Sequence, residues 1–198
     1  LYEISYNGGP FAYPPAQGTE LAAEESEGYD LGVGYFSTAG WYVEAVYFDQ
    51  SIEDEIFFDL VDFSGYLQGA GESTSEGVEL SSQVPVNEIF ALTANYTYTD
   101  TQESDGEQRL RVPKNMGNLG VLVTPWDDRL KINVNYRVAR DTADDIDGTI
   151  DDYEVLDLSV SYQALDQLEV YGRIENATDE KYQEIPDCNT ADPAGYAG

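Results

Sequence analysis

The feature of this sequence that most restricts its fold is a period-two alternation of apolar and polar side chains. In the clearest segment, 130–138, the apolar set is Leu130, Ile132, Val134, Tyr136 and Val138, and the polar set is Lys131, Asn133, Asn135 and Arg137. The same alternation recurs in 90–98, 156–162 and 168–174. Because successive side chains of a strand point to opposite faces, these segments are predicted to be strands with one apolar face and one polar face.

The connections between the predicted strands alternate in length. Strands are expected at 28–36, 41–60, 74–84, 89–100, 113–124, 129–140, 153–163 and 168–176, with Gly195 as a possible start of another. Short turns at 37–40, 85–88, 125–128 and 164–167 alternate with longer polar loops at 61–73, 101–112, 141–152 and 177–194. Such alternation is typical of outer-membrane barrels, whose short turns face the periplasm. The predicted fold is therefore all-β, an antiparallel up-and-down meander that forms part of a transmembrane outer-membrane β-barrel, with 1–27 as an irregular leading loop.

Composition restricts the class of protein further. The mean hydropathy is -0.43, and no window approaches the roughly 20 apolar residues of a membrane-spanning helix, so a helical membrane protein is excluded. A transmembrane barrel stays allowed because only every second residue of its strands faces lipid. The net charge of -30 argues against nucleic acid as a partner. The chain has no histidine, and its single Cys188 excludes an internal disulfide.

Aromatic residues are expected to form two girdles at the membrane interfaces. Near the short turns the candidates are Tyr35, Phe36, Trp41, Trp126 and Tyr162, and near the long loops they are Tyr96, Tyr98, Tyr136 and Tyr153. Aromatic residues are also common in strands of any sheet, so the girdle interpretation depends on the loop pattern.

Four short motifs, in order, resemble the C-terminal part of TonB-dependent receptors. The run Glu24-Glu25-Ser26-Glu27-Gly28-Tyr29-Asp30-Leu31-Gly32 is similar to the family's acidic lead into a strand, although the usual Asn-Pro and Pro-Glu before it are missing. Ser75-Glu76-Gly77-Val78-Glu79-Leu80 resembles the recurrent Gly-Val-Glu strand opening, and Leu110-Arg111-Val112-Pro113 resembles the Arg-x-Pro that leads back from an outer loop. Glu175-Asn176-Ala177-Thr178-Asp179-Glu180-Lys181-Tyr182 is similar to Asn-Leu-Phe-Asp-x-x-Tyr, with Ala177 and Thr178 replacing Leu and Phe.

This resemblance implies energised uptake across the outer membrane. In the family a barrel of about 22 strands encloses an N-terminal plug, on which TonB pulls to admit a ligand. The chain most resembles the cobalamin and ferric-siderophore branches, so we expect a metal chelate as ligand and outer-membrane lipid, the plug and TonB as partners. We expect the chain to be a fragment covering the C-terminal strands (28–198), without the plug and without a TonB box.

Two sets of residues are candidates for binding. One set consists of polar residues that are expected to face the lumen: Lys131, Asn133, Asn135, Arg137, Arg173 and Glu175. There these side chains either contact the plug or the ligand, or only pair with one another. In loop 141–152, residues 143–154 match part of an EF-hand loop, with Gly148 at its sixth position and Ala143 where the first ligand should be. Calcium is the candidate cofactor there, with Asp144, Asp145, Asp147, Asp151 and Glu154 as ligands, and a solvated acidic turn is the favoured alternative.

Other functions stay open at this point. One alternative is a small self-contained outer-membrane barrel with a structural or adhesive role, suggested by the count of eight strands. Another is a soluble, acidic, calcium-binding β-protein, which the charge and hydropathy allow. An enzyme is not expected, because no nucleophile, base and orienting group occur at a recognisable spacing.

Overall fold

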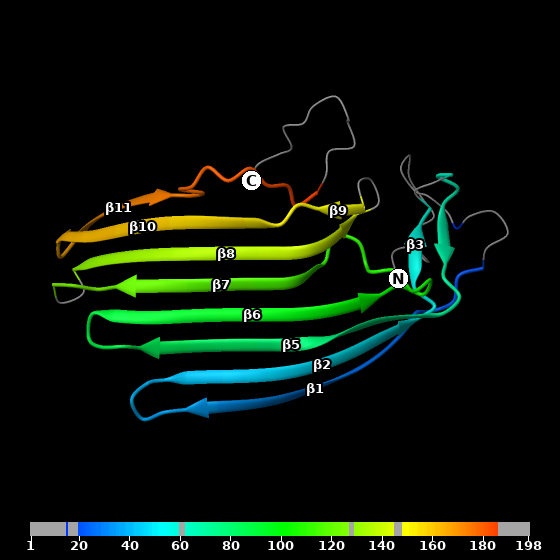
Figure 1. The fold of residues 1–198 in the computed structure, drawn as a ribbon, viewed down its shortest axis with the longest axis horizontal. Helices are drawn as coiled ribbons and strands as arrows, with labels where there is room; N and C mark the ends of the chain where they lie inside the picture. The colour runs from blue at the N-terminus through cyan, green and yellow to red at the C-terminus, as the bar shows by residue number, and fades with distance from the viewer. Residues whose placement is uncertain (1–14, 16–19, 60–61, 127–128, 145–147, 186–198) are drawn as a thin grey trace.

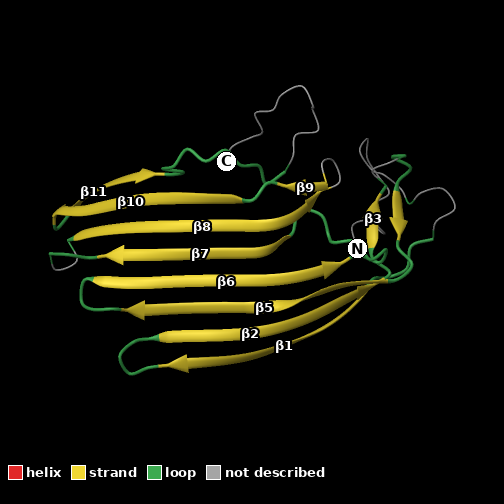
Figure 2. Ribbon diagram, viewed as in Figure 1, coloured by secondary structure: helices red, strands yellow, loops and turns green. Residues whose placement is uncertain are grey.

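The computed structural model describes residues 15, 20–59, 62–126, 129–144 and 148–185. In this part of the chain all regular structure is β-strand (Figure 2). The strands are β1 (Glu25–Phe36), β2 (Tyr42–Glu53), β3 (Ile56–Phe58), β4 (Tyr66–Gln68), β5 (Glu72–Pro85), β6 (Phe90–Gln102), β7 (Pro113–Val123), β8 (Leu130–Asp144), β9 (Gly148–Ile150), β10 (Tyr153–Leu165) and β11 (Leu168–Ile174). Among the described residues there is no helix long and apolar enough to cross a membrane.

Neighbours along the chain are neighbours in the main sheet. The order is β1-β2-β5-β6-β7-β8-β10-β11, all antiparallel, with β9 paired to the end of β8 and with β3 and β4 forming a separate hairpin. Figure 1 shows this as one curved sheet, with β1 and β11 at opposite edges. The predicted antiparallel meander is therefore confirmed. The described strands do not close into a barrel of their own, so they form an open section of a wall and not a small self-contained barrel.

Connections of different length lie at opposite ends of the sheet (Figure 1). The tight connections β1–β2, β5–β6, β7–β8 and β10–β11 define what we call the short-turn end. Backbone hydrogen bonds close the first two of them, from the amide of Ser37 to the carbonyl of Trp41 (2.9 Å) and from Val86 to Phe90 (2.8 Å). The longer connections define the long-loop end. The predicted segregation of loop length is confirmed.

The strand register places most of the apolar side chains of the eight long strands on one face, with exceptions such as Val46, Phe48 and Ile52 of β2. Val134 of β8 lies opposite Val121 of β7 and Leu158 of β10. At the other side of the sheet, Tyr47 of β2 lies opposite Leu31 and Val78. We call the surface in register with Val134 the apolar face, and the opposite surface the polar face. A one-residue slip in any pair would mix the two, so the alternation itself specifies the register.

Several boundaries differ from the sequence prediction. The strand expected at 41–60 ends at Glu53, because Asp54 has a left-handed backbone (φ 55°) and the chain leaves the sheet to form the β3–β4 hairpin. β1 begins at Glu25, within the stretch expected to be irregular. β8 continues to Asp144 and pairs with β9, so part of the expected loop 141–152 is a strand extension.

The tightest packing lies on the polar face near the long-loop end. Val155 and Ala139 are 1% and 2% exposed, whereas Leu31 on the apolar face is 72% exposed. The segment that follows β11 covers this region: the amide of Asn176 donates to Asp157 (2.9 Å) and Tyr182 stacks on Tyr153, with ring centroids 4.6 Å apart. The polar face is thus the one on which the chain folds back, and the apolar face stays open.

Of the nine residues expected in the two aromatic girdles, the register places five on the apolar face and two on the polar face, and a membrane interface around them stays a prediction. The register places Tyr35, Tyr96, Tyr98, Tyr136 and Tyr162 on the apolar face. Phe36 is adjacent to Tyr35 and therefore lies on the polar face, as does Tyr153, which pairs with Ala139. Position near a strand end does not determine the face, because each step of one residue reverses it.

Candidate functional site

The polar residues predicted from β8 share one face, as expected. Asn135 accepts a hydrogen bond from the amide of Asn118 on β7 (2.9 Å), and Arg137 pairs with Asp157 of β10 (3.5 Å). Lys131 and Asn133 lie on the same face, opposite Ser161 and Ser159. Two of the four β8 residues therefore connect neighbouring strands through their side chains, and contact of this set with a plug or ligand stays a prediction.

Arg173 and Glu175, the remaining members of the predicted polar set, lie at the end of β11. Arg173 lies on the polar face, opposite Ser159, and forms an ion pair with Glu175. Both side chains are more than half exposed. An exposed pair of this kind contributes little to stability, which leaves it available for other contacts.

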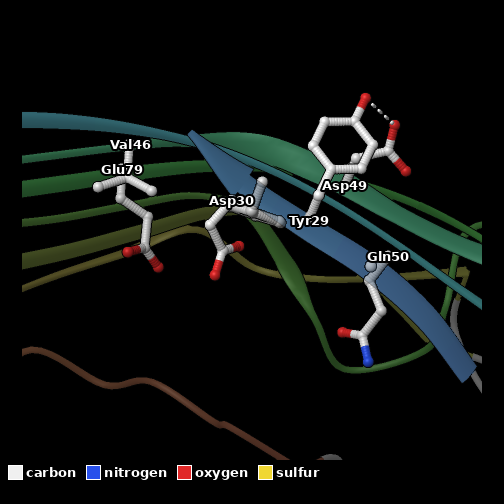
Figure 3. Close-up of a pocket in the computed structure, with 8 residues that line it drawn as sticks. Tyr29, Asp30, Val46, Asp49, Gln50 and Glu79 are labelled. Carbon is white, nitrogen blue, oxygen red and sulfur yellow. Dashed lines mark hydrogen bonds between the residues drawn. The ribbon is translucent and has the colours of Figure 1, made fainter. Parts of the chain in front are cut away.

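A second group on the polar face was not predicted as a site. Asp30 of β1, Gln50 of β2 and Glu79 of β5 line an open groove of about 590 Å³. In Figure 3 these three side chains point away from the side on which Tyr29 and Asp49 lie, joined by a hydrogen bond of 3.1 Å. We call this feature the acidic groove.

The acidic groove lacks basic neighbours. β1, β2, β5 and β6 contain no Lys and no Arg, so the nearest cations belong to strands farther along the sheet. No ion pair between described residues includes Asp30 or Glu79. Two carboxylates without a cation in an open groove attract a positively charged group from outside this sheet.

A glycine lies two positions before each carboxylate of the acidic groove, and one of them, Gly28, lines the groove. Gly28 precedes Asp30, and Gly77 precedes Glu79, by two positions, so each glycine lies on the same face as its carboxylate. A Cβ on Gly77 would lie 2.0 Å from the carbonyl oxygen of Tyr98 and 2.6 Å from the ring of Phe48. Only glycine fits there, because the Phe48 ring occupies the space above it. This repeated Gly-x-acid pattern was the signal in the sequence, but only the register brings the two copies together.

The described residues proposed for calcium have other partners or lie in different places. Asp144 is fully buried at its side chain and pairs with Arg111 (3.2 Å), whereas Glu154 pairs with Arg140 (2.6 Å). Asp145 and Asp147 lie outside the described residues. The interpretation of 141–152 as a solvated acidic turn is wrong for Asp144, because this side chain is buried and paired with Arg111, which is distant in sequence.

Asp151 lies elsewhere, in a cleft with Asp141, Asp152, Glu180 and Lys181. Within the described ranges no group of three or more carboxylate or thiol side chains is arranged to hold a metal ion. Calcium binding therefore stays a prediction.

The long-loop end carries one carboxyl with a shifted pKa outside the strands. Burial raises the pKa of Glu103 above its usual value, and repulsion from Asp105 and Glu55 acts in the same direction, against the attraction of Arg109. Arg109 itself donates from one nitrogen to both carboxylate oxygens of Glu55, at 2.7 Å each. The β6–β7 loop is thus held against the base of the β3–β4 hairpin by a strongly acidic cluster with one cation.

Comparison with known proteins gives a consistent family. The model of the TonB dependent receptor-like β-barrel family matches residues 1–177. The vitamin B12 transporter BtuB of Vibrio cholerae is 26% identical over 191 residues, covering 93% of this chain and 31% of the relative. The chain therefore spans about a third of the length of the curated relatives it matches.

Solved structures share the fold at low sequence identity. The copper transporter OprC superposes with a TM-score of 0.73 at 16% identity, over 87% of this chain and 29% of the other. The ferric yersiniabactin uptake receptor FyuA of Yersinia pestis gives 0.69 at 18% identity, over 90% and 30%. The ferripyoverdine receptor of Pseudomonas aeruginosa gives 0.70 at 16% identity, over 87% and 26%.

Proposed function

Because the chain belongs to the TonB-dependent receptor-like β-barrel family, we propose that it forms part of the wall of a receptor in the outer membrane of a Gram-negative bacterium. The receptor imports a metal chelate such as a ferric siderophore or cobalamin. The observation that carries this proposal is the division of the sheet into an apolar and a polar face over eight consecutive strands. Lipid covers the apolar face, and the polar face lines the lumen.

Relatives support the proposed cargo class. One curated relative is a vitamin B12 transporter, and the solved structures of similar fold include a copper transporter and receptors for two ferric siderophores. Each of these cargoes contains a transition metal. The polar face offers side chains for hydrogen bonding over its whole length, which suits a water-filled or plug-filled lumen.

The acidic groove is proposed as a contact for the plug. We expect a plug that fills the lumen to present cations to Asp30 and Glu79, since β1, β2, β5 and β6 have none of their own. Arginine suits this role because its guanidinium forms paired hydrogen bonds with a carboxylate. Charge pairs in a groove on the wall would hold the plug in place and still part when TonB pulls on it.

Uptake by cells tests the proposed function. The full-length gene is placed in a strain without its own chelate receptors, with and without TonB, and accumulation of radiolabelled cyanocobalamin and of a panel of ferric siderophores is measured. We expect TonB-dependent accumulation of at least one. Equal accumulation of every chelate in cells with and without TonB would refute the proposal.

Paired variants test the acidic groove in the same assay. Asp30→Asn with Glu79→Gln keeps the size of both side chains and removes their charges. We expect slower uptake or a leaky barrel that admits a large antibiotic. Glu169→Gln is the matched control, because Glu169 of β11 lies on the same face but away from the groove. An unchanged double variant would contradict the proposed plug contact.

A further inference from the structure

The β3–β4 hairpin, which we call the arm, projects at the long-loop end and is held by hydrogen bonds at its base. At its base the amide of Gly69 donates to the carbonyl of Glu55 (2.9 Å), and the side chain of Gln68 donates to the carbonyl of Asp54 (2.7 Å). The amide of Ile56 donates to the carboxylate of Glu24, which precedes β1 (2.7 Å). The stem of the hairpin is therefore closed by its own hydrogen bonds, and β3 is tied to the segment just before β1. Figure 1 shows the hairpin at the long-loop end of the sheet.

The tip of this arm presents an exposed phenyl ring on a strained backbone. Phe63 is 64% exposed and has a left-handed φ of 52°. Bulky residues rarely adopt this conformation, and it persists only where the surroundings impose it. Here they do: the carboxylate of Asp59 accepts from the amide of Asp62 (3.0 Å) and from the hydroxyl of Ser64 (2.6 Å), the two neighbours of Phe63.

Phe63 is the outer member of a three-ring cluster. Its ring packs edge to face with Phe58 (centroids 6.2 Å apart), which packs edge to face with Tyr66 (5.5 Å). The two inner rings hold the outer one in place, so its exposed side is available for a second aromatic group without a large loss of side-chain entropy. An apolar ring held out into solvent by a strained turn has no evident role in stabilising this sheet.

The charge around the arm restricts what can approach it. At the long-loop end Arg109, Arg111, Lys114 and Arg140 are each paired, with Glu55, Asp144, Asp100 and Glu154 respectively. Lys181 lines a cleft among acidic side chains. An anionic ligand thus meets a negative field and no unpaired arginine among the described residues, whereas a cation is attracted.

From these observations we infer that the ligand is an aromatic chelate without net negative charge, and that its ring docks on Phe63 at the tip of the β3–β4 hairpin. This inference rests on the proposed receptor function. Stacking supplies the apolar contact, and a positive group near the phenyl faces adds a cation–π contribution. The same field disfavours a chelate with several negative charges at Phe63.

Simple probes test this inference on the full-length protein in lipid nanodiscs. Phenyltrimethylammonium and benzenesulfonate carry the same ring and opposite charges, and tetramethylammonium has the charge without the ring. Dissociation constants are measured by saturation-transfer NMR at low salt. We expect phenyltrimethylammonium to bind several-fold tighter than either of the others, with the margin over benzenesulfonate shrinking at high salt.

Variants of Phe63 assign the binding to the arm. Phe63→Asn suits a left-handed backbone and removes the ring, and should weaken binding of phenyltrimethylammonium roughly threefold. Phe63→Trp should keep it, and Phe36→Ala, at the short-turn end, should not affect it. Equal binding of both charged aryl probes, or an unchanged Phe63→Asn variant, would overturn the inference. Uptake is a separate measurement, so loss of uptake with intact probe binding would count against the proposed function alone.

Discussion

Replacing Gly77 by alanine should destabilise the sheet more than any other glycine-to-alanine change in its long strands. The added Cβ would lie 2.0 Å from the backbone oxygen of Tyr98 and 2.6 Å from the ring of Phe48. The ring can rotate away, but the carbonyl cannot, because β5 and β6 are paired continuously from Thr74–Gln102 to Pro85–Ala91. Overpacking of this kind typically costs about 1–3 kcal/mol, and the fixed backbone contact places Gly77→Ala near the upper limit.

Two other glycines provide graded controls. At Gly120 the nearest atom to an added Cβ is the hydroxyl of Thr93 at 2.3 Å, which can rotate, so Gly120→Ala should cost less. At Gly172 the nearest atom is Val160 at 3.8 Å, so Gly172→Ala should be neutral or slightly stabilising.

The free energy of unfolding is measured by urea titration of the full-length protein in lipid vesicles. The expected order of loss is Gly77, then Gly120, then Gly172. Phe48→Ala should rescue Gly77→Ala only in part, because it removes the ring and leaves the Tyr98 carbonyl. A Gly77→Ala variant as stable as Gly172→Ala would refute the reasoning, because it would mean that β5 and β6 are not in this register.

Three further predictions concern the long-loop end. Arg111→Ala leaves the buried carboxylate of Asp144 without this ion pair and should lower the free energy of unfolding by about 2 kcal/mol. Glu103→Gln should raise the melting temperature at neutral pH, because the raised pKa of Glu103 means that stability falls as the pH rises through it. Millimolar calcium should raise the melting temperature by binding the folded chain at loop 141–152, and Asp145→Asn with Asp147→Asn should remove that response.

Each of these has its own control. Arg140→Ala breaks an ion pair that is half exposed on both sides and should cost less than about 1 kcal/mol, so equal losses would count against burial as the cause. The difference in melting temperature between wild type and Glu103→Gln should vanish below about pH 4, where the Glu103 carboxyl is protonated and both side chains are neutral. A difference that persists there would show that the raised pKa of Glu103 is not its cause. A monovalent salt at the same ionic strength must shift the melting curve less than calcium does, or only charge screening is at work.

The fold could be predicted because the alternation of segments such as 130–138 specifies both the strand and its faces. The β3–β4 hairpin could not, since Ile56–Phe58 continues the apolar pattern of the strand before it and only the left-handed Asp54 marks the break. A single residue with positive φ leaves no signal in an alternation of side chains.

The candidate site was harder to predict than the fold. Lys131 to Arg137 share one strand, so their common face followed from spacing alone. Asp30 and Glu79 are far apart in the sequence and meet only through the register of β1, β2 and β5. The ion pair of Asp144 with Arg111 depends in the same way on the fold, because it joins the end of β8 to the β6–β7 loop, and no local sequence pattern indicates it.

Spin-label accessibility along β8 in the full-length protein tests the central claim most directly. Cys188 is replaced by serine, and single cysteines at 131, 132, 133 and 134 carry the label in turn. We expect alternation, with labels at Ile132 and Val134 in contact with oxygen dissolved in lipid, and labels at Lys131 and Asn133 in contact with a water-soluble relaxation agent. The inverse alternation, or water contact at all four positions, would contradict a wall whose apolar face meets lipid.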